Sequence, residues 1–259
     1  MAPLPPSPRL LLIGSDNPTT WIVYNRLVRE FGIFDAVIEN TIGRRALIRN
    51  RVRKLGWPAV LSQMAFIALI RPLLRSGAAA RVREICRINT MEIHEPLTPA
   101  IRRVQNINSP EAVALITAAK PDVVIVNGTR ILKRHVLEST SATFINTHQG
   151  ITPTYRGAHG GYWALYQNDP ERCGVTLHLV DQGIDTGNII AQALIAPGPL
   201  DGYITYPYLQ IAAALPLLVR AIRDCAAGTL QTSKAEGPSA VWYHPGFFQY
   251  IRARLRGVR

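Results

Sequence analysis

The sequence predicts an α/β protein with a mostly parallel sheet flanked by helices. First, short runs of Val, Ile and Leu alternate along the chain with segments whose apolar residues recur at helical spacing. Second, helices between successive strands are the crossover connections that parallel strands need. Third, 259 residues with 47% hydrophobic and 18% charged content can bury one large core. Disordered and coiled-coil classes are therefore excluded.

The first strand and helix have the clearest local pattern. Leu10–Ile13 is an apolar run that ends at Gly14. Asn17 suits the N-cap of a helix, and Pro18 suits its first position. Apolar residues then recur at helical spacing, so we expect the helix to continue to about Phe31.

The rest of the chain continues this alternation. Further strands are expected at 34–38, 123–126 and 142–148, with a strand, loop and strand at 174–193. Helices are expected across most of 43–87, at 112–119 and at 205–227. We expect one domain over 1–228 and a short C-terminal appendage over 229–259, which is aromatic and basic and would pack on the main sheet.

Positive charge is concentrated in a basic insert at about 43–87. The chain has a net charge of +12, and the insert holds eleven Lys and Arg against one acid. Such an excess favours anionic partners. Its apolar run, Leu55–Ile70, is interrupted by Pro58 and is too short to span a bilayer. A core-packed helix with a basic solvent face is preferred to an amphipathic helix on an anionic membrane surface.

Cysteine usage and the amino end indicate the compartment. Cys86, Cys173 and Cys225 are an odd number at wide spacings, so neither a disulfide scaffold nor a structural zinc site is expected. The amino end has a five-residue apolar run preceded by several prolines, which does not fit a signal peptide. We expect a cytoplasmic protein.

Three polar residues are candidates for catalysis. Asn146 and His148 stand two residues apart at the carboxyl end of a strand, so they point to the same side at an edge where α/β sheets bind ligands. An Asn amide can donate to a developing oxyanion, and a His can take and give a proton. Asp185 is the candidate carboxylate that orients His148. Asp181 fits either a functional role or an ordinary turn.

These motifs together resemble the formyltetrahydrofolate-dependent formyltransferase family. The resemblance covers roughly 110–195 and rests on N-x-H at 146–148, P-x-Y-R-G at 153–157, G-V-T-x-H-x-V-D at 174–181 and D-x-G at 185–187. It implies a Rossmann-like formyltransferase fold with 1–228 as the catalytic domain. It also implies 10-formyltetrahydrofolate as the one-carbon co-substrate, and no metal.

The resemblance implies a role for each group of residues. Asn146 and protonated His148 would hold the oxyanion formed when an acceptor amine attacks the formyl carbon, while Asp185 positions His148 and helps to relay the proton. The folate would lie between two loops whose residues are Asn127, Gly128, Thr129, Arg130, Ile131, Leu132, Asp181 and Ile184. His178 would be structural.

The acceptor would contact the segment that follows the N-x-H motif. The candidates are Tyr155, Arg156, Gly157, His159, Tyr162 and Trp163, with an arginine for a diphosphate and aromatic rings for a sugar or base. Tyr162 and Trp163 fit a helix core equally well.

The acceptor itself is expected to be a nucleotide sugar. The 31 residues from 229 onward are too few for the carboxyl-terminal barrel of methionyl-tRNA formyltransferases. The resemblance is therefore strongest to nucleotide-sugar N-formyltransferases, which formylate a nucleoside-diphosphate-linked 4-amino-4,6-dideoxy sugar for O-antigen or other surface polysaccharide. GDP-perosamine is preferred to a dTDP-sugar because the insert is rich in arginine.

Two alternatives stay open at this point. One is a methionyl-tRNA formyltransferase-like enzyme, and the other is a basic protein that docks RNA or a membrane surface through 43–87. The preferred partners are folate and a nucleotide-linked amino sugar, with no nucleic acid. A peripheral membrane contact is not favoured, and a homodimer is left open.

Overall fold

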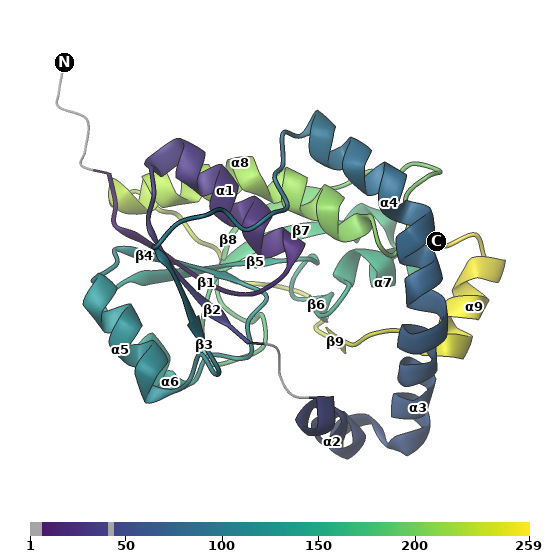
Figure 1. Cartoon of the computed structure of the whole chain (residues 1–259). Helices are drawn as coiled ribbons and strands as arrows, with labels where there is room; N and C mark the ends of the chain where they lie inside the picture. The colour runs from purple at the N-terminus through teal and green to yellow at the C-terminus, as the bar shows by residue number, and fades with distance from the viewer. Residues whose placement is uncertain (1–6, 41–43) are drawn as a thin grey trace.

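A seven-stranded sheet forms the centre of the computed structural model, which describes residues 7–40 and 44–259 (Figure 1). Its order is β3-β2-β1-β4-β5-β7-β8. The strands are β1 (Leu10–Ser15), β2 (Asp35–Glu39), β3 (Ile101–Val104), β4 (Val123–Asn127), β5 (Thr143–His148), β7 (Gly174–Leu179) and β8 (Ile189–Leu194). The first five are parallel, whereas β7 is antiparallel to both β5 and β8. The predicted fold class is confirmed.

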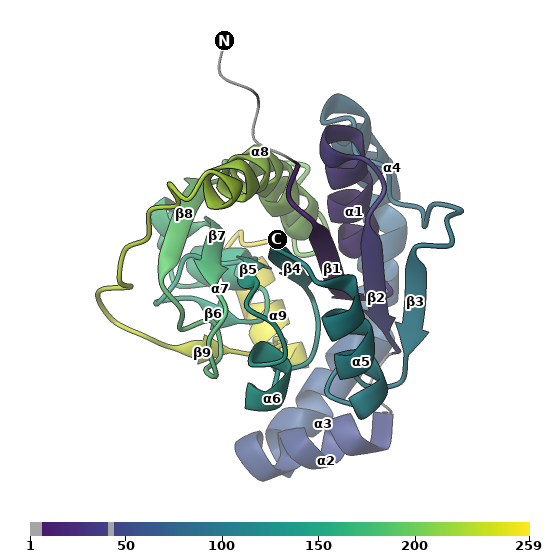
Figure 2. The ribbon, with the colours of Figure 1, turned by 90° about the vertical axis from the view of Figure 1, so that its left-hand side faces the viewer.

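Helices cover both faces of this sheet. One face carries α1 (Pro18–Phe31), α8 (Tyr206–Ala226) and the end of α4 (Arg71–Ile88), and the other carries α5 (Pro110–Ala119) and α6 (Arg134–Leu137) (Figures 1 and 2). Each face encloses its own cluster of buried aliphatic side chains. The sheet is therefore the middle layer of three, and its carboxyl-terminal edge is left for the site.

The ends of the helices follow the predicted capping chemistry. The Asn17 side chain accepts a hydrogen bond from the Thr20 N–H at 3.1 Å, and Pro18 begins α1. Ser109 caps α5 in the same way, accepting from the Ala112 N–H at 3.2 Å. Gly228 follows α8 with a φ of 69°, a left-handed conformation that glycine adopts without strain.

The basic insert forms a column of helices along one edge of the molecule (Figure 1). It consists of α2 (Arg44–Leu55), α3 (Trp57–Ala65), the π-helical turn η1 (Phe66–Ile70) and α4. Gly43 and the side chains of Arg44 and Arg45 lie outside the described residues. The predicted helical character of the insert is confirmed.

The position of this column differs from the expectation of a core-packed helix. Trp57–Ile88 is one continuous helical segment of 32 residues, long and apolar enough to cross a membrane by length and composition, and 17% of its most apolar window is buried. This helical segment continues beyond the end of the apolar run, because Arg71 is a good helix former and does not end the helix. One side packs on the protein, through Val60 and Phe66 among others, and the rest faces outward.

Residues after Gly228 pack mainly on other elements than the main sheet. Ser233 forms a bridge to Ile189 at the edge of β8. Beyond it, β9 (Val241–Trp242) pairs in parallel with β6 (Arg156–Gly157), and α9 (Phe247–Leu255) packs against α3 and η1. An aromatic cluster joins these parts to α7 (Gly160–Tyr166) and to Tyr203 and Tyr206 near the start of α8. The division at residue 228 stays a prediction.

Candidate functional site

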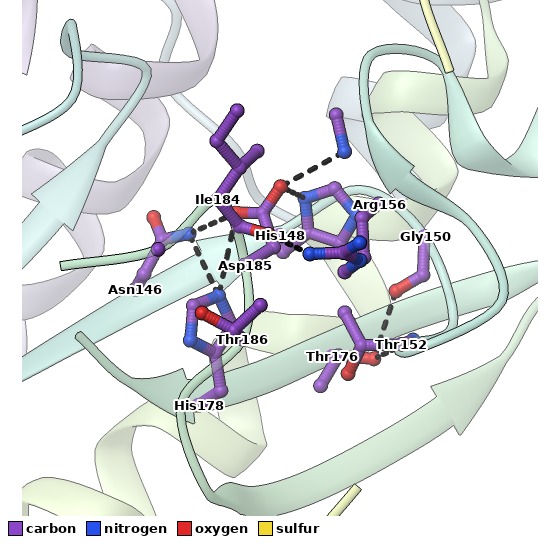
Figure 3. Close-up of polar contacts among 12 residues, drawn as sticks. Asn146, His148, Gly150, Thr152, Arg156, Thr176, His178, Ile184, Asp185 and Thr186 are labelled. Atoms are coloured by element: carbon purple, nitrogen blue, oxygen red, sulfur yellow. Dashed lines mark hydrogen bonds and ion pairs between the residues drawn. The ribbon is translucent and has the colours of Figure 1, made fainter. Parts of the chain in front are cut away.

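Three polar side chains meet beyond the carboxyl end of β5. Asn146 and His148 lie two residues apart on that strand, and Asp185 lies in the loop between β7 and β8 (Figure 3). One oxygen of Asp185 accepts from Asn146 Nδ2 at 3.3 Å, and the other lies 3.3 Å from His148 Nδ1. The Gly157 N–H also donates to Asp185, at 2.9 Å. The carboxylate therefore lies between an amide and an imidazole.

His178 of β7 supports this group from the neighbouring strand. It is the register partner of Asn146, and its Nε2 lies 3.0 Å from Asn146 Nδ2 and 3.5 Å from Asp185 Oδ1. Its Nδ1 lies 2.7 Å from the Leu179 carbonyl oxygen, which can only accept, so Nδ1 is the donor. Nε2 is then the acceptor, so it accepts from Asn146 Nδ2 and orients that amide, and the structural role of His178 stays a prediction.

The electrostatics keep Asp185 ionised. Burial by itself would raise the pKa of Asp185, but His148, His178 and the Gly157 N–H lower that pKa to about 2. Burial lowers the pKa of His148, and the nearby Asp185 carboxylate opposes that shift. His148 Nε2 donates to the Tyr155 carbonyl at 2.7 Å. Both ring nitrogens of His148 therefore face acceptors, Asp185 at Nδ1 and the Tyr155 carbonyl at Nε2.

A pocket of about 820 Å³ opens over these residues. That volume lies within the range of about 300–1,000 Å³ typical of small-molecule sites. Residues 127–132 after β4 form one wall, and residues around 181–185 form another. Arg51, Arg71, His159 and His244 line a third part, which comes from the basic insert and from the segments next to β6 and β9.

Comparisons with known proteins bear on this arrangement. Residues 79–198 match the family model described as formyl transferase. A sugar N-formyltransferase from Shewanella sp. has a TM-score of 0.56 at 17% identity, covering 90% of this chain and 76% of that one. An N-formyltransferase from Helicobacter canadensis, in complex with folinic acid and dTDP-3-aminofucose, has a TM-score of 0.53 at 16% identity, covering 90% and 70%.

The chain has the formyltransferase fold. The matched family segment includes β5, the β7–β8 loop and all three catalytic candidates. In sequence, the chain is 36% identical over 99 residues to the methionyl-tRNA formyltransferase of Chlorobium chlorochromatii. That match covers 38% of this chain and 31% of the relative, so the chain spans about a third of the relative's length.

The residues that the formyltransferase resemblance assigned to folate all line the pocket: Asn127, Gly128, Thr129, Arg130, Ile131, Leu132, Asp181 and Ile184. Two of these residues also form hydrogen bonds within the protein. Asn127 is buried and donates to Thr20 Oγ1 at 3.0 Å. Asp181 accepts from the Gly183 N–H at 2.9 Å and from the Thr186 hydroxyl at 2.7 Å, so it shapes its own loop. The turn role of Asp181 is thus present in the structure.

Arg130 holds the 127–132 loop to β2. The side-chain Nε of Arg130 lies 2.5 Å from Glu39 Oε2, and the backbone N–H of Arg130 donates to Glu39 Oε1 at 2.6 Å. Glu39 is buried, so the pair is largely removed from solvent. The charge of Arg130 is therefore balanced within the protein, and the loop has a fixed position.

The acceptor candidates fall into two groups. Gly157 and His159 line the pocket. Tyr155, Tyr162 and Trp163 are buried in the aromatic cluster and do not line the pocket. The ring of Tyr155 stacks on Trp242, and α7 packs Tyr162 and Trp163 inward against their neighbours. Their predicted contacts with an acceptor therefore do not fit the structure.

Arg156 is also engaged by the protein. Its Nη1 donates to the Ile184 carbonyl at 2.9 Å, which ties β6 to the loop that carries Asp185 (Figure 3). Its Nε is buried without a hydrogen-bond partner, and the side chain is not part of the pocket lining. The arginine expected for a diphosphate is thus a loop tether.

Sequence reasoning missed three residues of this site. Arg51 and Arg71 stand in the basic insert, whose charge was noticed but whose pattern does not show which arginines face inward. His244 lies beyond β9 in the aromatic tail, and no local motif marks it. Within the described ranges, no three His, Cys, Asp or Glu side chains gather as a metal site would require, and the three cysteines are free.

Proposed function

We propose that the protein transfers the formyl group of 10-formyltetrahydrofolate to the amino group of a nucleoside-diphosphate-linked 4-amino-4,6-dideoxy sugar. The observation that carries this proposal is the placement of Asn146 and His148 around the Asp185 carboxylate inside the matched family segment. GDP-perosamine is the preferred acceptor and a dTDP-sugar the next. The reaction would take place in the cytoplasm and would serve the synthesis of O-antigen or another surface polysaccharide. The folinic acid and the dTDP-3-aminofucose bound in the Helicobacter canadensis structure support a folate and a nucleotide-linked amino sugar as the two substrate classes.

The residues present fit a folate. The 127–132 and 181–185 walls would hold its pterin ring, with backbone polar groups from both loops and an aliphatic surface from Ile131 and Leu132. A folate held in this way would have its formyl group over the end of β5, beside Asn146.

The proposed chemistry is a direct transfer. The acceptor amine attacks the formyl carbon and forms the new C–N bond, and Asn146 donates to the oxyanion that develops. The amine proton passes to the His148–Asp185 pair, where the carboxylate stabilises the imidazolium. The bond between the formyl carbon and N10 then breaks, and N10 takes up that proton as tetrahydrofolate leaves.

A transfer assay tests the proposal. Purified protein is mixed with 10-formyltetrahydrofolate and either GDP- or dTDP-linked 4-amino sugars, and the products are analysed by mass spectrometry. We expect one sugar to gain a formyl group and the gain to disappear in His148→Ala. No transfer to any of these sugars would refute the sugar assignment.

A methionyl-tRNA formyltransferase activity is the second candidate. It is favoured by the sequence match to the Chlorobium chlorochromatii enzyme. Charged initiator tRNA is therefore included in the same assay. Formylation of the tRNA with none on the sugars would establish this second candidate in place of the first.

A further inference from the structure

Two arginines of the basic insert face the pocket without an acidic partner. Arg51 of α2 and Arg71 of α4 both line the wall that lies next to His159 and His244. Among the ion pairs of the described residues, none involves either arginine. Arg71 Nε is buried without a hydrogen-bond partner. Partly buried cations that lack partners are costly to keep unless a ligand pairs with them.

The residues next to these arginines include a group of polar rings. Tyr203 OH lies 2.7 Å from His159 Nε2 and 2.9 Å from His244 Nδ1, and these two nitrogen atoms lie 3.0 Å apart. Burial and the two arginines lower the pKa of His159, and they lower that of His244 to about 4. The region thus offers two cations and neutral hydrogen-bonding groups, a combination suited to an anion.

We propose that Arg51 and Arg71 bind the phosphate or diphosphate group of the acceptor. This inference rests on the proposed function and refines it, because it places the anionic end of the acceptor against the basic insert. Guanidinium groups match phosphate oxygens through paired hydrogen bonds, which Lys cannot do. Arg156, the residue first expected in this role, is bound to the Ile184 carbonyl instead.

Binding of inorganic pyrophosphate tests this site without requiring turnover. The variants are Arg51→Gln and Arg71→Gln, and the matched controls are Arg53→Gln and Arg75→Gln, exposed arginines of the same two helices that do not line the pocket. Calorimetry should show pyrophosphate affinity reduced about 10-fold to 100-fold in the first pair and unchanged in the controls. Folinic acid affinity should be unchanged in all four.

The outcomes separate this inference from the proposed function. Equal pyrophosphate affinity in Arg71→Gln and Arg75→Gln would overturn the anion site even if sugars are formylated. Selective loss of pyrophosphate binding, together with no transfer to any sugar, would keep the anion site and refute the proposed function. Absence of pyrophosphate binding to the unmodified protein would also overturn the site.

A separate observation concerns the outer side of the same helices. An apolar stripe of exposed side chains runs along the column: Trp57, Leu61, Met64, Leu69 and Leu73. Their spacings are four, three, five and four residues. The five-residue step crosses η1, and a π-helical turn pairs residues five apart, so Leu69 stays on the same side as the others.

The neighbouring helix α9 has the same character. It packs against α3 and η1, and it exposes Phe248, Ile251 and Leu255 at spacings of three and four (Figure 1). Phe248 is 77% exposed and Leu255 84%. Exposed arginines lie between and after these residues, at 252, 254 and 256.

Charge decides which partner suits this face. Arg53 and Lys54 precede the stripe and Arg75 follows it, all exposed, within an insert that holds one acid. A second copy would bring two such basic surfaces together, which is unfavourable. Nucleic acid would satisfy the charge but would leave the large aliphatic side chains without partners. A bilayer with anionic lipids satisfies both.

We infer that the exposed side of α3, η1, α4 and α9 docks on the surface of an anionic membrane. The column lies on the bilayer and does not cross it. Its inner side packs on the domain at Phe66, and Arg71 reaches the pocket wall, so the helix cannot leave the protein to span a membrane. The apolar stripe enters the headgroup region while the flanking cations contact lipid phosphates.

Vesicle flotation tests this second inference. Unilamellar vesicles of phosphatidylcholine alone are compared with an equal mixture of phosphatidylcholine and phosphatidylglycerol. We expect the protein to float with the mixed vesicles and the double variant Leu69→Gln/Leu73→Gln to lose about 10-fold or more in partitioning. The matched control is Leu97→Gln/Leu200→Gln, two exposed leucines outside the stripe.

Two results would overturn the membrane assignment. One is equal partitioning of the stripe variant and the control variant. The other is a stable dimer by light scattering in which Leu69→Gln/Leu73→Gln restores the monomer, because a second copy would then cover the stripe. Circular dichroism of both double variants checks that each is folded.

Discussion

Asp185 owes its position to an uncommon backbone conformation. Its φ is 51°, in the left-handed region, and its carboxylate reaches the Gly157 N–H and Asn146 from there. Non-glycine residues adopt this conformation at some cost, and Asp tolerates it better than most. The β7–β8 loop is thus shaped so that one carboxylate serves two catalytic candidates.

We predict that Asp185→Asn slows formyl transfer by about 10²-fold to 10⁴-fold, because an amide can neither stabilise a His148 imidazolium nor relay a proton. Single-turnover rates with saturating 10-formyltetrahydrofolate measure the effect. The control is Asp35→Asn, an exposed carboxylate at the start of β2 outside the pocket lining, which should keep the rate. Full turnover in Asp185→Asn would remove the carboxylate from the proposed proton path.

Gly150 allows the close approach that positions His148. A Cβ at this residue would lie 2.2 Å from the Tyr155 carbonyl oxygen and 2.8 Å from His148 Nε2. We predict that Gly150→Ala lowers the free energy of unfolding by about 1–3 kcal/mol, as overpacking does. Gly77→Ala is the control, since nothing lies within 4 Å of its Cβ position in α4 and it should be neutral or stabilising. Urea unfolding of both variants decides the matter.

At this scale the sequence predicted side chains whose position follows from strand geometry. The N-x-H pattern places Asn146 and His148 on one side of a strand whatever else the chain does. Tyr162 and Trp163 could not be placed in the same way, because a short helix presents rings to core and ligand at similar spacing. Arg51 and Arg71 depend on how α2 and α4 pack, and that is a tertiary property.

The 127–132 loop depends on β2 for its position. Glu39, at the end of β2, is 2% exposed and pairs with Arg130 of the loop. Loops next to binding sites need such support, because their backbone has few partners of its own.

We predict that Glu39→Ala lowers the free energy of unfolding by about 1–3 kcal/mol, since it leaves the half-buried Arg130 guanidinium without its carboxylate partner. Folinic acid affinity should also fall, because the loop loses its anchor. Glu138→Ala removes the exposed pair with Arg134 and should cost less than about 1 kcal/mol. Similar losses in both variants would contradict the supporting role of Glu39.

The segment that joins β9 to α9 makes stability depend on pH through His244. Because burial lowers the pKa of His244 from 6.5 to about 4, the unfolded chain takes up a proton at higher pH than the folded one. The contribution of neutral His244 to the free energy of unfolding is therefore complete above pH 6.5, and it is lost as the pH falls toward 4. We predict that His244→Asn removes on the order of 3 kcal/mol of this acid sensitivity. The measurement is urea unfolding at pH 8 and pH 4, and an unchanged difference would contradict it.

Elements with strong local signals were predicted well. The α1 and α5 caps and the end of α8 at Gly228 all follow from residues next to the boundary. The short pieces β3, β6 and β9 were not predicted, because strands of two to four residues form by pairing across the fold and have little periodicity. The π-helical turn was also not predicted, because one wider turn shifts the apolar spacing of a helix by a single residue.

At the scale of the whole molecule, the proposed function has the folate and the acceptor meet different parts of the pocket, which we call the folate wall and the acceptor wall. The folate wall belongs to the central sheet and its loops, whereas the acceptor wall combines the basic insert with β6 and the region around β9. Trp242 couples that wall to the core: its ring stacks on Trp163 at 4.9 Å, and its Nε1 donates to the Thr154 carbonyl at 3.0 Å.

We predict that Trp242→Ala raises the acceptor KM more than it weakens folinic acid binding, because it loosens the acceptor wall and leaves the folate wall intact. The exposed Trp57 on α3 provides the control, and Trp57→Ala should change neither value in an assay without lipid. Equal losses for the two substrates in Trp242→Ala would mean that the pocket behaves as one unit.

The fold class followed from the alternation of strands and helices, but the disposition of charge did not follow from the sequence. The basic insert was expected to bury its apolar residues, since that is the usual fate of an apolar run in a globular protein. Its outward stripe becomes visible only when the helix is placed at the edge of the molecule. Charge and hydropathy patterns leave that placement open.

The pairing of β6 with β9 also affects when the pocket is completed during synthesis of the chain. The central sheet is complete once β8 has been made, yet the pocket wall is finished only when residues 241–244 have left the ribosome. A nascent chain that ends before them would bind folinic acid but would not formylate an acceptor, which stalled chains can test. Activity would then begin in one late step of synthesis, after the sheet has already folded.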